Sequence, residues 1–470
     1  MKKFLPRLLV VIFSTSILVF GQSDPVKPDA KPDVTTDVKN DVKTNAKPDV
    51  KADSKPDERT AQAIFEEANG YLGKRYQEFN KQNLAYDPKV EAQVKKEQHD
   101  LALKNAAILE SRGLKGDDPY YQGLLYHIAG NGDAALAVMQ RFIADHPDGE
   151  KAQSARNVVV LYSVRKEKVG DAVAAVEAYA QHQPQNSEDR YRMEFVIADA
   201  FLRARDFKQT AIHAEQMLVE AKTFATKHKS EVSKRDDMLM KSSLVLADAY
   251  ASSDRKELAI RVLEDLRRMS MSLPSGNIYK VATLRLASMS PTTSLQKLSD
   301  EMASAPFEAP PELAVSQWID QSPVKISDLK GQVVLLDFWA PWCGPCRFTF
   351  PRLSQWHQAY KDKGLVILGV TKYFGHGDEG ALTKAEELVY LRDFKKRNRL
   401  PYGFLVADSD KNNFNYGVFS IPMSFLIDRR GVVRFISAGA NPDEITLLGK
   451  MIKKLVDEPA EARTETGQNR

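Results

Sequence analysis

The sequence predicts a multidomain protein in which an all-α helical repeat domain is followed by an α/β domain. From about Thr60 to Asp300, Ala, Leu, Glu and Lys dominate, the apolar residues follow helical spacing, and strand-like alternation is absent. The proline-rich run at 305–311 marks a stiff junction. After it, apolar strand-like runs alternate with helical runs, and this pattern is typical of an α/β sheet.

The N-terminus predicts export. Lys2, Lys3 and Arg7 precede an apolar run at 8–20, so we expect a signal peptide over residues 1–21. An uncleaved membrane anchor is the alternative. In both cases the rest of the chain is expected to be periplasmic or otherwise extracytoplasmic. Residues 22–58 repeat Lys-Pro-Asp with few large apolar residues and are predicted to be a disordered linker. Residues 458–470 are predicted to be a disordered tail.

The helical region, assigned to residues 60–300, contains recurring helix pairs. Gly170–Val173 echoes Gly132–Ala135, and Ala247–Tyr250 echoes Ala198–Phe201. The small residues at these positions allow close helix approach. The region resembles degenerate tetratricopeptide repeats, although its period departs from a strict repeat of about 34 residues. Such an array is either a groove for a protein ligand or a structural spacer, and the sequence leaves both interpretations open.

The α/β domain is expected to cover residues 313–457. Apolar runs predict strands and periodic runs predict helices, with a hairpin around Arg429–Gly431 that places an antiparallel edge on the sheet. The predicted strands are 333–338, 365–370, 424–427 and 431–436, and the predicted helices are 351–361, 384–397 and 442–456.

The chain has only two cysteines, Cys343 and Cys346, in one Cys-x-x-Cys between a predicted strand and a helix. A disulfide across so short a loop stabilises a fold weakly, so the pair is interpreted as a redox switch. At a helix N-terminus the Cys343 thiolate is favoured and attacks, and Cys346, a turn further on, resolves the mixed disulfide.

Composition excludes other chemistries. Two cysteines and eight scattered histidines do not supply a four-ligand zinc site, so no metal and no bound cofactor are expected. A formal net charge of +4 gives no sign of a nucleic-acid partner.

The segment Asp337–Cys346 resembles the active-site segment of thioredoxins, and Pro351 matches the proline that kinks their active-site helix. Ser420–Met423 resembles the cis-proline loop of that family. The resemblance implies that Pro422 is cis and packs against the cysteines. It also implies that the Ile421 backbone pairs with an extended substrate, with Trp342 as a further substrate contact.

Residues 313–457 resemble the extracytoplasmic TlpA/ResA subgroup, which carries a long insert at the equivalent of 369–415. Asp378, Glu379 and Glu386 lie in this insert, but none aligns with the acidic residue that parts of the subgroup carry there. Asp337 instead matches the buried acid of thioredoxins. Desolvation would raise its pKa and let it take the proton of Cys346. The alternative is a solvated aspartate at the strand edge.

The resemblance implies an extracytoplasmic thiol–disulfide oxidoreductase that acts on protein disulfides and takes electrons from a membrane thiol reductant. The Gly-Pro between the cysteines favours a reductant, because thioredoxin has a potential near about −270 mV. One alternative is a helical-repeat scaffold with a redox-sensing domain. Another is a redoxin-type peroxidase, but that family carries Thr or Ser where this chain has Ala340. Arg347 either lowers the pKa of Cys343 or is a solvated helix residue.

Overall fold

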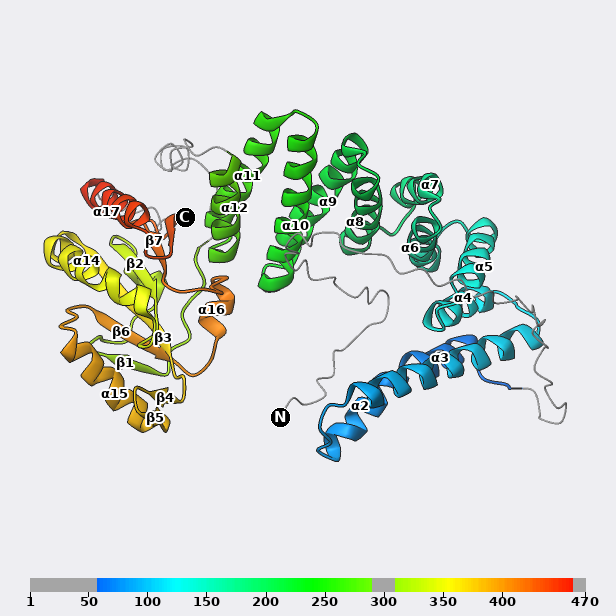
Figure 1. The fold of residues 1–470 in the computed structure, drawn as a ribbon, viewed down its shortest axis with the longest axis horizontal. Helices are drawn as coiled ribbons and strands as arrows, with labels where there is room; N and C mark the ends of the chain where they lie inside the picture. The colour runs from blue at the N-terminus through cyan, green and yellow to red at the C-terminus, as the bar shows by residue number, and fades with distance from the viewer. Residues whose placement is uncertain (1–56, 290–308, 460–470) are drawn as a thin grey trace, which may run out of the picture. The chain divides into compact units, whose positions relative to one another are not determined.

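The computed structural model describes residues 57–289 and 309–459 (Figure 1). The predicted signal peptide, nearly all of the predicted linker and nearly all of the predicted tail lie outside the described residues. The described chain is helical up to residue 289 and combines a sheet with helices from residue 309 onward, so the predicted multidomain fold class is confirmed. By its internal contacts the chain divides into two compact units, Met1–Ser163 and Val164–Arg470.

In the first unit, α1 packs against α3 and α4, and α4 packs against α5. Polar side chains start three of these helices, since Thr60, Asp87 and Asn131 each accept a hydrogen bond from a backbone N–H of the first turn. The helices are α1 (Ala61–Asn69), α2 (Tyr71–Lys81), α3 (Pro88–Ser111), α4 (Asp118–Ile128), α5 (Gly132–Asp145) and α6 (Glu150–Arg165), the last of which contains the boundary between the units.

The second unit begins with six helices, α7 to α12, which we call the helical array. Each packs against the next along the chain, and buried alanines such as Ala198, Ala211, Ala247 and Ala259 lie where neighbouring helices meet. This matches the role expected of the small residues. The helices are α7 (Val169–Gln181), α8 (Ser187–Arg203), α9 (Phe207–Lys227), α10 (Val232–Ser252), α11 (Lys256–Ser272) and α12 (Gly276–Met289).

Residues 309–459, which we call the sheet domain, contain a six-stranded sheet in the order β1-β6-β3-β2-β7-β8. The β2–β3 and β3–β6 pairs are parallel, and the remaining pairs are antiparallel, which confirms the predicted antiparallel edge. The strands are β1 (Gln317–Ile319), β2 (Val333–Phe338), β3 (Leu365–Lys372), β6 (Gly403–Ala407), β7 (Met423–Ile427) and β8 (Val433–Ala438), and a small hairpin is formed by β4 (His376–Gly377) and β5 (Gly380–Ala381).

Each face of the sheet has its own apolar core. One core contains Val333 and Leu335 of β2 together with side chains of α14 (Gly344–Tyr360), α15 (Lys384–Arg397) and α17 (Pro442–Asp457). Figure 1 shows α14 and α17 side by side over this face. The other core contains Val334 and Leu336, with side chains of the 3-10 helix η2 (Ile326–Leu329) and residues that follow α16 (Lys411–Asn415).

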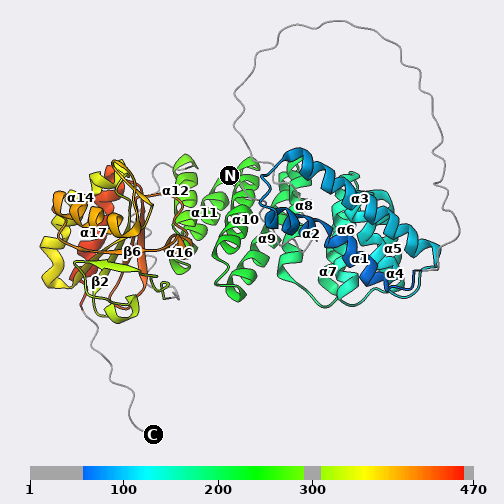
Figure 2. The same cartoon turned by 90° about the horizontal axis from the view of Figure 1, so that it is seen from below.

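The helical array completes the second face. Met271 of α11 and Tyr279 of α12 are buried in the same apolar cluster as β2 and β7. The Tyr279 ring meets that of Phe435 edge-on, with centroids 6.2 Å apart. Helices α11 and α12 contact β8, and α10 contacts α16. Figure 2 shows α12 between α11 and the strands of the sheet domain. The array therefore supplies part of the core of the sheet domain.

Some predicted boundaries were wrong. The strand β6 was not predicted, because its five-residue apolar run is buried on both faces and lacks the alternation of a half-buried strand. The helical run predicted at 351–361 is the second part of α14, which begins at Gly344 directly after Cys343 and carries Pro351 in its interior, as the predictions for these two residues required. The strand predicted from 431 begins at Val433.

Candidate functional site

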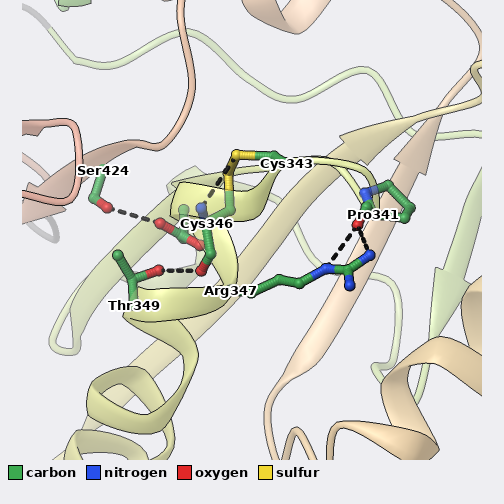
Figure 3. Close-up of a disulfide and its surroundings, with 7 residues drawn as sticks. Pro341, Cys343, Cys346, Arg347, Thr349 and Ser424 are labelled. Atoms are coloured by element: carbon green, nitrogen blue, oxygen red, sulfur yellow. Dashed lines mark hydrogen bonds between the residues drawn. A yellow bond between two sulfur atoms is a disulfide. The ribbon is translucent and has the colours of Figure 1, made fainter.

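The two cysteines form a disulfide at the N-terminus of α14, with their Cα atoms 5.3 Å apart (Figure 3). Cys343 is the N-cap residue of the helix, and its Sγ accepts a hydrogen bond from the backbone N–H of Cys346 at 3.2 Å. A sulfur in this position faces the positive end of the helix dipole, so the local structure favours a thiolate at Cys343 after reduction.

The two sulfurs differ in access. Cys343 is 3% exposed and Cys346 is fully buried, whereas the neighbouring Trp342 is 55% exposed. Any partner must therefore approach at Cys343 and pass Trp342. The greater exposure of Cys343 agrees with the expectation that Cys343 attacks and Cys346 resolves.

Arg347 stabilises the loop before the cysteines. Its Nε and Nη2 donate to the carbonyl oxygen of Pro341 at 3.1 and 2.6 Å, as Figure 3 shows. The guanidinium also lies over the ring of Phe394, 5.4 Å from its centroid. Arg347 is exposed on α14, as expected of a solvated helix residue, and its side chain also holds the backbone of the loop.

Asp337 is buried behind the disulfide. In β2 it points to the same face as Val333 and Leu335, whose apolar cluster also contains Cys343 and Cys346. It is 1% exposed, so the solvated alternative is wrong. Its Oδ1 accepts a hydrogen bond from Ser424 Oγ at 2.8 Å, and its Oδ2 has no hydrogen-bond partner among the described residues. Burial raises the pKa of Asp337 to about 7, and the Ser424 bond opposes that rise.

The loop before β7 lies next to the cysteines. The Ile421–Pro422 peptide bond is cis, as the resemblance implied. Phe338 pairs with Met423 in the antiparallel β2–β7 register, which places Pro422 beside the start of the loop that leads to Cys343. Ile421 packs against the cluster that holds both cysteines. The fold thus brings Cys343, Cys346, Asp337, Ile421 and Pro422 together.

An apolar groove of about 320 Å³ opens beside this loop. The exposed ring of Trp342 meets that of Phe374 edge-on, with centroids 5.6 Å apart. Phe414 and Phe419 also expose more than half of their surface. The groove is lined by Trp342, Phe374, Phe414, Phe419, Ser420 and Ile421, among others.

The comparisons with known proteins agree on the second half of the chain. Residues 306–436 match a family model described as the AhpC/TSA family. Protein DipZ of Mycobacterium tuberculosis is 33% identical over 145 residues, which cover 29% of this chain and 19% of DipZ. The thiol-disulfide oxidoreductase ResA of Bacillus anthracis is 32% identical over 110 residues, 23% of this chain and 57% of ResA. The chain thus spans about a fifth of DipZ and just over half of ResA.

The chain is also similar to a solved structure from Chlorobium tepidum TLS, described as a thiol:disulfide interchange protein of the thioredoxin family. It is 21% identical, with 33% of this chain and 99% of that chain covered and a TM-score of 0.27. The ResA relationship, the disulfide at the start of α14 and the cis proline before β7 together identify the type of this domain. The sheet domain is a thioredoxin-fold domain of the TlpA/ResA type.

In this TlpA/ResA-type domain, the insert carries a buried carboxylate that the sequence analysis missed. Glu387 is 1% exposed, and its two oxygens accept the backbone N–H groups of Phe374 and Gly375, each at 2.8 Å. It therefore holds the turn that carries one wall of the groove. The helical spacing of Glu387 relative to buried Leu391 was the only sequence signal for it.

Two of the three acidic residues named for the insert have structural contacts, and the third, Glu379, is exposed. Glu386 forms a capping box with Thr383, and Asp378 accepts a hydrogen bond from Tyr390. Within residues 57–289 and 309–459, no cluster of three or more His, Cys, Asp or Glu could hold a metal ion. In the same residues, no helix combines the length and apolar character needed to span a membrane.

Proposed function

We propose that this protein is an extracytoplasmic thiol–disulfide oxidoreductase that reduces disulfides in protein substrates through its Cys-Gly-Pro-Cys motif. The observation that carries the proposal is the Cys343–Cys346 disulfide at the N-terminus of α14, beside the cis Pro422 loop. The ResA relationship supports the type of reaction. The basic and apolar N-terminal sequence supports export.

The reaction proceeds in two exchanges. The Cys343 thiolate attacks one sulfur of the substrate disulfide, the substrate S–S bond breaks, and the released sulfur leaves as a thiolate that takes up a proton. Cys346 then attacks Cys343 Sγ, so that the second substrate sulfur leaves and the Cys343–Cys346 disulfide forms. Two electrons pass from the dithiol to the substrate. A membrane thiol reductant then restores the dithiol.

Asp337 serves as the base for the second exchange. A thiol attacks only as a thiolate, so Cys346 must lose its proton inside an apolar core. With a pKa of about 7, Asp337 is ionised in a substantial fraction of molecules at neutral pH and is matched to that proton transfer.

The substrate lies along the Ser420–Pro422 loop. Ile421 has no main-chain hydrogen bond to any described residue, so its N–H and C=O are available to an extended segment. Trp342 and the groove beside it receive the apolar side chains of that segment.

Insulin reduction tests the proposal. The wild type should precipitate insulin in the presence of dithiothreitol, Cys343→Ser should not, and Cys346→Ser should accumulate a mixed disulfide with the substrate. Equal activity of the wild type and Cys343→Ser would refute the proposal. A reduction potential near about −120 mV instead of near −270 mV would refute the reductant direction.

A second candidate function is a helical-repeat scaffold with a redox-sensing thioredoxin-fold domain. It is favoured by the shared core of the helical array and the sheet domain. The double variant Cys343→Ser/Cys346→Ser separates the two functions. A scaffold retains its partner with unchanged affinity without the cysteines, whereas an oxidoreductase loses covalent capture of its substrate.

A further inference from the structure

A side chain of the helical array reaches the proposed substrate loop. Lys280 of α12 donates from Nζ to Ser420 Oγ at 3.0 Å, and Ser420 lines the groove beside the cysteines. The two residues are 140 positions apart in the chain. An ammonium from the array is therefore in contact with the loop on which the substrate is proposed to lie.

The position of Lys280 is fixed by the packing around it. At the start of α12, Gly276 donates its backbone N–H to the carbonyl oxygen of Tyr416 at 2.9 Å. The residue before Lys280, Tyr279, is fully buried against the sheet. These two anchors hold the backbone of Lys280 in place, and the bond to Ser420 restrains the end of its side chain before a ligand binds.

The charged groups at this end of the groove leave the Lys280 ammonium able to bind an anion. Lys372, which lines the groove, already pairs with Asp410 at 2.7 Å. Lys280 forms no ion pair with any described residue. An ammonium has three N–H donors, and the bond to Ser420 uses one of them.

The surface continues beyond Lys280 along α12. Leu284 lies one helical turn further on and is 62% exposed. A segment that leaves the Ser420–Pro422 loop in this direction meets a positive charge and then an apolar side chain.

We propose that Lys280 binds a carboxylate next to the cysteine of an extended substrate segment, so that the helical array sets the charge preference of the thiol–disulfide site. The proposal deepens the oxidoreductase function and rests on it. The occupant is an acidic cysteine-containing segment of a protein substrate, and Lys280 acts as a specificity-determining residue.

Four synthetic peptides test this preference. Each carries one cysteine as a mixed disulfide with 2-mercaptoethanol, a neutral leaving group, and has either aspartate or lysine directly before or directly after that cysteine. Reduced full-length protein is mixed with each peptide, and the rate constant of exchange is measured from the change in tryptophan fluorescence.

The wild type should react about two- to fivefold faster with the aspartate peptide than with the lysine peptide on at least one side of the cysteine, as for a partly exposed ion pair. Lys280→Met should abolish this ratio, and Lys280→Glu should invert it. Near 1 M salt the wild-type ratio should approach one, because the Debye length falls to about 3 Å. Lys208→Glu makes the same charge change on the exposed surface of α9 and should leave the ratio unchanged.

The outcomes separate the two proposals. If the wild type reacts neither with any of the four peptides nor with free 2-hydroxyethyl disulfide, the oxidoreductase function is refuted. This inference is then refuted as well. If the wild type reacts but shows no charge preference, or keeps its preference in Lys280→Glu, the inference is overturned and the oxidoreductase function stands. The rate with 2-hydroxyethyl disulfide, which carries no charge, should be the same in Lys208→Glu and the wild type.

Discussion

Asp337 and Ser424 lie opposite each other on the antiparallel strands β2 and β7, and the Ser424 hydroxyl donates to Asp337 Oδ1 at 2.8 Å. Ser424 follows the cis Pro422 by two residues. The strand that follows the proposed substrate loop thus carries the hydroxyl that contacts the buried acid. In the proposed mechanism, this relationship connects substrate binding with the proton transfer from Cys346.

Ser424→Ala should shift the pH dependence of the second exchange upward. The Ser424 bond lowers the pKa of Asp337, so its loss raises that pKa further above its ordinary value. Asp337 acts as a base only when ionised, so the rate should then rise at a higher pH, by up to about one unit for a hydrogen bond of about 1 kcal/mol. Stopped-flow measurement of mixed-disulfide decay between pH 5 and 9 reports the shift. Ser424→Thr keeps the hydroxyl and should keep the wild-type profile.

Asp337→Asn should slow the second exchange about 10²- to 10⁴-fold, the usual contribution of a positioned general base. The first exchange depends on Cys343 and should change little. The mixed disulfide should therefore accumulate in Asp337→Asn and be visible by mass spectrometry. Wild-type decay of that intermediate in Asp337→Asn would show that another group takes the proton.

Asp337→Asn should also stabilise the oxidised protein at high pH. The pKa of Asp337 rises from 3.8 to about 7 on folding, so between these values the folded state binds more protons than the unfolded state. The free energy of unfolding of the wild type therefore falls as the pH rises through this window. Relative to the wild type, Asp337→Asn should gain up to about 4 kcal/mol at pH 8 and almost nothing below pH 4. Urea denaturation at both pH values measures the difference. Glu444, whose pKa burial also raises to about 7, is present in both proteins and cancels.

Glu387→Gln should weaken the groove wall. One oxygen becomes an NH₂ group and faces a backbone N–H of Phe374 or Gly375, so a buried donor loses its acceptor. The expected cost is about 1.5–3 kcal/mol in the free energy of unfolding, with a higher KM for peptide disulfides. Glu386→Gln, one residue away, retains a capping-box acceptor and should be close to neutral. Equal effects of both changes would contradict the role of Glu387.

Tyr279→Ala should destabilise the sheet domain although residue 279 lies in the helical array. The fully buried ring fills the core on one face of the sheet, and truncation of a large aromatic side chain costs about 3–5 kcal/mol. Near-UV circular dichroism and insulin reduction should both report the loss. Leu284→Ala on the same helix removes an exposed side chain and should change stability by less than about 0.5 kcal/mol. A sheet domain unaffected by Tyr279→Ala would contradict the shared core.

Several features were predictable because their signals are local. Near residue 305 the spacing of the apolar residues changes from helical to strand-like, which predicted an all-α region followed by an α/β region. The strand–cysteine–helix order placed Cys343 at an N-cap, and the resemblance placed Pro422 in a cis peptide bond. Asp337 in an apolar run predicted burial, and the structure confirms it.

Other features depend on contacts between distant residues, which leave no local pattern. β6 was missed because burial on both faces removes its alternation. Ser424 and Glu387 resemble ordinary strand and helix residues until the fold places them against Asp337 and the Phe374 turn.

By itself, the sequence determined the redox motif, its place between a strand and a helix, and the succession of a helical region and an α/β region, since each is written in neighbouring residues. Only the tertiary structure decided which side chains surround that motif. The clearest case is the array, whose Tyr279 and Lys280 reach the sheet core and the Ser420 loop. Packing brings together residues that are far apart in the chain, and an apolar or charged residue on a helix does not reveal which surface it will meet.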